Sequence, residues 1–129
     1  MTIVFVHGVP VTSAVWAPLI SKLPRSQRQD VVRLSPPGFG AALPADFGAT
    51  FLDHGERHVE ETFSGDVAAR PGLVPVATDD LTAGSVALRH RAAQRAGARA
   101  VDLDALGHWW MLQDPARAAR MLSDFWNSL

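Results

Sequence analysis

A chain of 129 residues, 47% of them hydrophobic and 19% charged, has the length and composition of one globular domain with its own core. A formal net charge of −1 without runs of like charge excludes an electrostatic interface for nucleic acid or for an anionic membrane. The lack of cysteine excludes disulfides, thiolate nucleophiles and thiolate metal ligands.

No apolar run approaches the roughly 20 residues that a membrane helix needs, and the first residues lack the basic and apolar regions of a signal peptide. We therefore expect a cytoplasmic protein that forms a single domain over residues 1–129. The expected partner is a small molecule or a second copy of the chain, and no cofactor is indicated.

The first third of the chain predicts a strand, a helix and a second strand. Residues 2–6 form a β-branched and aromatic run without polar alternation, typical of a strand buried on both faces. Ser13 is the expected N-cap of a helix that ends by Pro24. Val31–Leu34 is the next strand, and the prolines and glycines of residues 35–40 predict a loop after it.

Residues 41–71 give a weaker signal. Their apolar residues fall at helical spacing, although Gly55 and Gly65 each cost a helix about 1 kcal/mol relative to alanine. We expect a loop followed by one helix with poorly defined ends.

The next unit is again a strand and a helix. Leu73–Ala77 is predicted as a strand, with Pro75 at a position where one ladder hydrogen bond is not needed. Ser85 is the expected cap of a helix that runs to about Arg95, and Gly97 stops it.

The end of the chain repeats this pattern. Arg99–Leu103 is predicted as the fourth strand, and Asp114 followed by Pro115 marks the start of the last helix. Because strands and helices alternate, we expect a parallel sheet covered by helices. The residues of the last helix expected to be buried are Ala118, Met121, Leu122, Phe125 and Trp126.

Four motifs, taken in this order, resemble the α/β-hydrolase superfamily. They read VFVHGVP at 4–10, LSPPGFG at 34–40, VATDD at 76–80 and LGHWWMLQDP at 106–115. The nearest similarity is to haloalkane dehalogenases, epoxide hydrolases and related esterases. The nucleophile elbow of that family, a small-x-nucleophile-x-small turn between strand and helix, is missing here, and so is the cap domain. The chain therefore resembles a shortened form of the family.

Two serines come close to the elbow pattern. Ser64 lies in TFSGD, but no buried strand precedes it and Asp66 stands where a small residue is needed. Ser85 lies in AGSVA, at a place where the family begins an ordinary helix. We interpret Ser85 as a helix cap and Ser64 as a surface or loop serine.

The resemblance also implies a sheet. In the family the strands that carry HG and Pro-Gly are neighbours, and so are those that carry the acid and the base. If the strands between these pairs are absent, the pairs can close into one open parallel sheet of about four strands in the order 2-1-3-4, with helices on both faces. A ligand crevice then belongs at the switch point between strands 1 and 3.

The resemblance gives His108 the position of the general base. An imidazole suits this task if a carboxylate fixes its tautomer and stabilises its protonated form. The alternative is a histidine packed between the sheet and Trp109 and Trp110. These two tryptophans could wall a pocket or belong to the core.

Asp80 is the preferred carboxylate, because it follows the strand-end residue Ala77 by three positions, as the acid does in the family. Both Asp79 and Asp80 could instead cap a helix or face solvent.

Gly8 and Val9 resemble the family's oxyanion loop, in which the Val9 amide points at a developing oxyanion. The alternative is a plain tight turn after the strand. Halide chemistry is not expected, since Val9 replaces the asparagine that binds halide in the dehalogenase-like members. His7 is expected to order this loop by hydrogen bonding, and Trp109 is a candidate substrate-contacting residue.

His54 and His58 have the spacing of two metal ligands on one helix, but the glutamate between them is one place late and no third ligand is evident. We interpret them as a solvated helix face and expect no metal site.

Two functions follow as hypotheses. The first is a slow hydrolase of small esters, in which Asp80 orients His108 and His108 activates water or an unplaced hydroxyl. The alternative is a non-catalytic remnant or engineered truncation that binds an apolar ligand or a partner. Free sheet edges and an apolar mouth bearing Phe39, Trp109 and Trp110 also predict a homodimer. This dimer could be domain-swapped, with His108 of one copy facing Gly8 of the other.

Overall fold

A computed structural model describes residues 2–8, 11–35, 40, 42 and 71–129 of the chain. The predicted helix at 41–71 lies almost entirely outside these residues. So do several residues singled out from the sequence, namely Val9, Phe39, His54, His58 and Ser64.

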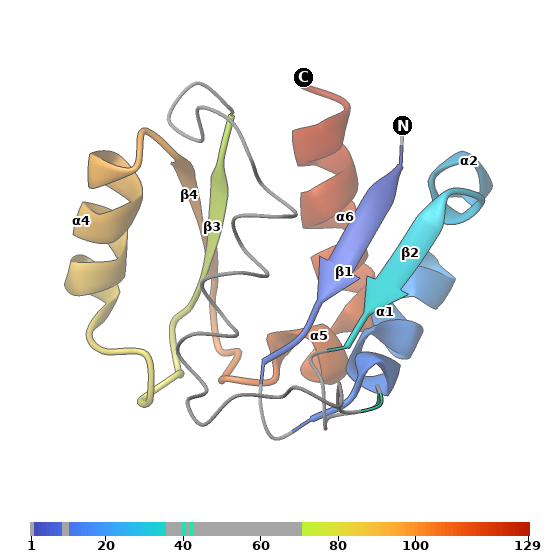
Figure 1. Ribbon diagram of the computed structural model, residues 1–129. Helices are drawn as coiled ribbons and strands as arrows, with labels where there is room; N and C mark the ends of the chain where they lie inside the picture. Colours follow the sequence, from blue (N-terminus) through green and yellow to red (C-terminus); the bar gives the residue numbers. More distant parts are fainter. Residues whose placement is uncertain (1, 9–10, 36–39, 41, 43–70) are drawn as a thin grey trace.

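Two pairs of parallel strands form the framework of the described residues (Figure 1). β1 (Ile3–Val6) pairs with β2 (Val31–Leu34), and β3 (Leu73–Ala77) pairs with β4 (Arg99–Leu103). The α/β class and both predicted neighbour pairs are confirmed. The expectation of one four-stranded sheet in the order 2-1-3-4 is wrong, since β1 and β3 share no hydrogen-bonded ladder in the described part of the chain.

Between the two described strand pairs lie side chains and a cavity instead of backbone hydrogen bonds. A cavity of about 300 Å³ separates His7, at the end of β1, from Asp80, which follows β3. The indole rings of Trp16 and Trp110, with centroids 6.5 Å apart, stand in its wall. Ladder strands lie about 4.8 Å apart. In the described residues, the ends of β1 and β3 therefore face each other across this cavity and form no ladder.

The segment between β1 and β2 contains three short helical elements. Thr12 caps the first of them by accepting a hydrogen bond from the amide of Ala14 at 3.4 Å, so the expected cap at Ser13 is wrong by one residue. Pro18 lies in the first turn of α1, where its missing N–H removes no hydrogen bond. The elements are η1 (Ser13–Trp16), α1 (Ala17–Lys22) and α2 (Arg25–Arg28).

The helices of the second half begin and end at the predicted signals. Ser85 caps α4 (Val86–Arg95) by accepting a hydrogen bond from the amide of Leu88 at 3.2 Å, and Gly97 follows with a φ of +62°. Asp114 caps the last helix by accepting a hydrogen bond from the amide of Arg117 at 2.9 Å. The two C-terminal helices are α5 (Trp110–Gln113) and α6 (Pro115–Trp126).

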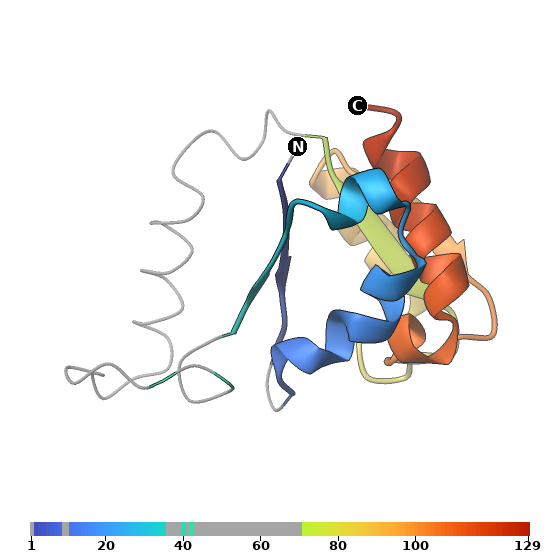
Figure 2. The same cartoon turned by 90° about the vertical axis from the view of Figure 1, so that its right-hand side faces the viewer.

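Helices α1 and α6 cover one face of β1 (Figure 2). Ile3 and Phe5 are buried on that face, whereas Val4 and Val6 on the other face are 46% and 39% exposed. The prediction that β1 is a strand buried on both faces is therefore wrong. The buried core cluster consists of Ile3, Phe5, Leu19, Leu23, Met111, Ala118 and Ala119.

Around the second pair, α4 packs against both β3 and β4. Val76 and Ala77 at the end of β3 and Leu103 at the end of β4 are almost completely buried. These buried ends give the loops that follow them, which carry the candidate site, a fixed base. Among the residues described, no helix combines the length and the apolar character needed to cross a lipid bilayer.

Candidate functional site

An aspartate and a histidine meet at the carboxyl ends of the second strand pair. His108 Nδ1 lies 3.0 Å from Asp80 Oδ2. Asp80 follows β3 and His108 follows β4, and the carboxyl ends of neighbouring parallel strands lie at one edge. The Asp80 side chain is 7% exposed and that of His108 is 53% exposed. The pair therefore joins a buried carboxylate to a solvent-accessible imidazole.

The Asp80 carboxylate is held by the turn that follows it. Its Oδ1 accepts hydrogen bonds from the Thr82 hydroxyl at 2.7 Å, the Thr82 amide at 2.8 Å and the Ala83 amide at 3.3 Å. The Thr82 hydroxyl is the largest cause that lowers the pKa of Asp80 well below its usual range; burial opposes it, and the Thr82 amide, His108 and the Ala83 amide add to the lowering. Asp80 is therefore a carboxylate at neutral pH.

Arg89 of α4 fixes the backbone of the same turn. Its guanidinium donates to the carbonyl of Ala77 at 2.7 Å and to the carbonyl of Asp80 at 3.3 Å. Arg89 thus ties α4 to the end of β3 and to the backbone of Asp80.

The loops after β3 and β4 are also bonded to each other. The amide of Asp79 donates to the carbonyl of Leu106 at 2.9 Å, and the amide of Ala105 donates to the Thr78 hydroxyl at 2.9 Å. Ala105 takes a φ of +60°, a conformation that costs a residue with a Cβ about 1 kcal/mol. These contacts bring the loop that carries His108 onto the loop that carries Asp80.

Asp79, the other candidate acid, does not contact His108. It is exposed, and its carboxylate accepts a hydrogen bond from the Thr78 hydroxyl at 3.4 Å. Of the two neighbouring aspartates, the structure therefore places Asp80 beside the histidine.

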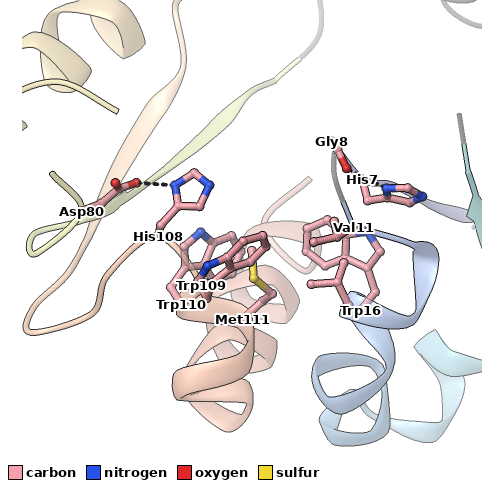
Figure 3. A pocket seen from close by; sticks show the side chains of 10 residues that line it. His7, Gly8, Val11, Trp16, Asp80, His108, Trp109, Trp110 and Met111 are labelled. Atoms are coloured by element: carbon pink, nitrogen blue, oxygen red, sulfur yellow. Dashed lines mark hydrogen bonds and ion pairs between the residues drawn. The ribbon is translucent and has the colours of Figure 1, made fainter. Parts of the chain in front are cut away.

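The cavity of about 300 Å³ extends from the Asp80–His108 pair to the end of β1 (Figure 3). One nitrogen of His108 contacts Asp80, and the other points away from Asp80, toward the side on which His7 and Gly8 lie. The walls are mostly apolar. The lining residues are His7, Gly8, Val11, Val15, Trp16, Asp80, His108, Trp109, Trp110 and Met111.

His7 and Gly8 form the opposite end of the cavity. The buried His7 donates from Nδ1 to the carbonyl of Gly8 at 2.8 Å, the kind of loop-ordering bond that the sequence predicts. A Cβ built on Gly8 would meet no heavy atom within 4 Å, so open space lies beside this backbone. The Val9 amide, the expected oxyanion donor, lies outside the described residues.

The two tryptophans beside His108 line the cavity. Trp109 is 38% exposed, and its ring meets the His108 ring edge-on at 5.1 Å. Trp110 is half-buried and packs against the core cluster. Trp109 is therefore a wall residue rather than a core residue, whereas Trp110 belongs to both wall and core.

Thr82, which contacts both members of the pair, was not expected at the site, and neither were the cavity-lining residues Val11, Val15, Trp16 and Met111. The Thr82 hydroxyl lies 2.9 Å from His108 Nδ1, as well as 2.7 Å from Asp80. A threonine two positions after an aspartate favours a local hydrogen-bonded turn, and this was the available signal. Ser85 caps α4 and does not line the cavity. Within the described ranges, no three histidine or acidic side chains cluster in a way that could hold a metal ion.

Comparisons with models of known protein families, with curated proteins and with solved structures found no match.

Proposed function

We propose that this chain is a small α/β-hydrolase-like enzyme that hydrolyses short esters slowly, with His108 as the general base. One observation carries the proposal. His108 donates from Nδ1 to a buried carboxylate while its other nitrogen faces a cavity next to Gly8. The order of the four sequence motifs supports it as a resemblance.

In the proposed reaction, neutral His108 keeps its proton on Nδ1, and Nε2 takes a proton from a water molecule in the cavity. The water oxygen forms a bond to the ester carbonyl carbon, and the carbonyl oxygen becomes an oxyanion. Asp80 stabilises the resulting imidazolium. As the tetrahedral intermediate collapses, the carbon–alkoxide bond breaks, and Nε2 returns its proton to the departing alkoxide.

The oxyanion is proposed to form at the loop that follows β1. Backbone amides in such a loop can donate to a developing charge, and the open space beside Gly8 allows a carbonyl oxygen to come close to the backbone. The Val9 amide remains the proposed donor.

The cavity limits the substrate. At about 300 Å³ it stands at the lower end of ordinary ligand sites, and its walls are mainly valine, tryptophan and methionine. A short acyl chain fits this space better than a long one. The reaction should be slow, because a general base alone contributes about 10² to 10⁴-fold and no covalent intermediate divides the barrier.

A series of p-nitrophenyl esters from acetate to octanoate tests this function. We expect turnover above buffer that is highest for the shortest chains, without an initial burst of nitrophenol. Rates equal to buffer for every ester would remove the proposal. A burst of one equivalent would show a covalent intermediate and would contradict the water mechanism.

The alternative is a non-catalytic module that binds an apolar ligand. It is favoured by one observation: among the described residues, no hydroxyl or carboxylate is hydrogen-bonded to the cavity-facing nitrogen of His108. This alternative predicts quenching of tryptophan fluorescence by small apolar ligands without any turnover. It also predicts no labelling by a fluorophosphonate probe.

We also propose that the chain forms a homodimer. Val4, Val6 and Val32 are exposed on one face of the first strand pair, and apolar sheet surface favours association. A plain dimer is preferred to a swapped one, because Gly8 and His108 already line one cavity within a single chain. Light scattering over a range of concentrations tests this, and a constant mass of 13.9 kDa would refute it.

A further inference from the structure

The Thr82 hydroxyl occupies a central position in the Asp80–His108 pair. Its Oγ1 lies 2.7 Å from Asp80 Oδ1 and 2.9 Å from His108 Nδ1, while Nδ1 lies 3.0 Å from Asp80 Oδ2. Three polar groups thus meet at hydrogen-bond distance. Only two protons, one on the hydroxyl and one on the imidazole, are available to satisfy them.

One arrangement of these protons places a hydrogen atom in all three contacts. The Thr82 hydroxyl donates to Asp80 Oδ1, and His108 Nδ1–H is shared between Asp80 Oδ2 and Thr82 Oγ1. In the opposite arrangement the hydroxyl donates to Nδ1. The hydroxyl proton and the lone pair of His108 Nδ1 are then both used in that one bond, and neither contact with the carboxylate contains a proton. Two short contacts between acceptors would result, which is unfavourable.

We infer that Thr82 is a positioning residue that holds His108 in the tautomer with its proton on Nδ1 and so leaves Nε2 free as the base. This inference rests on the proposed general-base function of His108. Half of the His108 side chain is exposed, so packing alone does not fix the ring. Because the Thr82 oxygen is a second acceptor beside Asp80, rotation of the His108 ring would break two contacts of Nδ1 instead of one.

Thr82 is well suited to this role because it is itself fixed to the acid. Its amide donates to Asp80 Oδ1 at 2.8 Å, and its hydroxyl donates to the same oxygen. One residue therefore clamps the carboxylate with its backbone and orients the imidazole with its side chain.

The same geometry argues against Thr82 as a nucleophile. Its hydroxyl proton points to a carboxylate, and its oxygen contacts the imidazole through Nδ1, the nitrogen that is bonded to Asp80. Thr82 is not among the residues that line the cavity. An ester in the cavity would meet Nε2 of His108 rather than this hydroxyl.

The test compares Thr82→Val, which removes the hydroxyl, with Thr82→Ser, which keeps it. Long-range ¹H–¹⁵N spectra report which nitrogen of neutral His108 carries the proton, and this readout needs no turnover. We expect the Nδ1–H form in the wild type and in T82S, and a mixture of both tautomers in T82V. If the ester activity exists, kcat should fall about tenfold in T82V while KM stays unchanged, because a tenfold change corresponds to about one hydrogen bond. The activity should recover in T82S.

Three results would overturn the inference. They are an unchanged tautomer in T82V, equal losses in T82S and T82V, and a covalent adduct on Thr82 after reaction with an activated ester. Thr82 is exposed, so its replacement removes no core packing; should T82V fail to fold, Thr82→Ala provides the same comparison. If all variants lack activity while the tautomers behave as expected, the proposed function fails and the positioning role stands.

Discussion

Replacing Asp80 with asparagine removes the negative charge of this side chain but keeps its size and shape, so the variant tests the role of the charge. The carbonyl oxygen of the new amide can still accept hydrogen bonds from the Thr82 and Ala83 groups that now reach Oδ1. Its NH₂ group would then face His108 Nδ1, which is a donor in the wild type. Two donors cannot bond each other, so His108 must move its proton to Nε2. The nitrogen that faces the cavity would no longer be a base.

The expected cost in stability follows from the four hydrogen bonds to the carboxylate. Bonds to a charged group contribute about 1.5–3 kcal/mol each and neutral ones about 0.5–1.5 kcal/mol. Relief of the buried charge offsets part of the loss. We expect D80N to lower the free energy of unfolding by about 1–2 kcal/mol at pH 7, and to lower the ester rate by about 10²-fold.

The stability difference should depend on pH in a defined direction. The folded-state pKa of Asp80 is lowered, mainly by the Thr82 hydroxyl, so its charge stabilises the protein fully above the unfolded-state pKa of about 3.9. This contribution is lost as the pH falls from there through the folded-state value. The difference between wild type and D80N should therefore be largest near neutrality and shrink below about pH 4.

Urea unfolding at pH 7, 5 and 3 measures this difference, with Asp102→Asn as the matched control. Asp102 also pairs with a histidine, His90, at 2.8 Å, but both side chains are more than 40% exposed, so its loss should cost at most about 1 kcal/mol. An Asp80 variant as stable as the wild type at pH 7 would refute the reasoning. So would a stability difference of equal size at pH 7 and pH 3.

Three further variants probe single features of the structure. Gly8→Ala should unfold within about 0.5 kcal/mol of the wild type, since its methyl group has open space, but should lower kcat/KM about tenfold by filling the substrate's approach; full activity would count against a site beside this loop. Ser85→Ala should lose about 1 kcal/mol in urea unfolding because α4 loses its cap, while ester activity stays; a lost activity would make Ser85 part of the chemistry. Ala105→Gly should raise the unfolding free energy by about 0.5 kcal/mol, because glycine adopts the φ of +60° without the steric strain of a Cβ, which outweighs its larger entropic cost; a loss above about 1 kcal/mol would contradict this.

The second half of the fold was readable from the sequence because its signals are local. Ser85 and Gly97 mark the ends of α4 as predicted, and the strands Leu73–Ala77 and Arg99–Leu103 have the predicted bounds. Caps and turn residues act within a few positions of the chain, and short strands stand out between them.

The face that β1 buries could not be read in this way. Residues 3–6 are all apolar, so their hydrophobic pattern has no period of two and does not distinguish the buried Ile3 and Phe5 from the exposed Val4 and Val6. Packing against α1 and α6, elements distant in sequence from one another, decides which face is covered.

Local sequence signals also could not show whether β1 pairs with β3. It depends on whether two strands separated by a long stretch of chain can approach to ladder distance. In the described part of the chain, the strand ends instead face each other across a cavity walled in part by the indoles of Trp16 and Trp110. Trp110 lies two residues after His108, so the segment that brings the histidine to the site also supplies part of this wall.

The candidate site was readable in part. The motif order pointed to Asp80 and His108, which the structure brings together at 3.0 Å, and to Gly8 on the opposite side of the cavity. Thr82 was missed because its importance comes from a turn that folds its hydroxyl back between the other two side chains. The spacing of Asp80 and Thr82 favours a local turn, but it does not identify the contact between Thr82 and His108.

The most direct test of the general-base role is the hydrolysis of p-nitrophenyl acetate by the wild type and by His108→Ala. His90→Ala is the matched control, because His90 also pairs with an aspartate but does not line the cavity. We predict that H108A falls to the buffer rate, a loss of about 10²-fold or more, and that H90A keeps the wild-type rate. Equal rates for the wild type and H108A would contradict the assignment of His108 as the base.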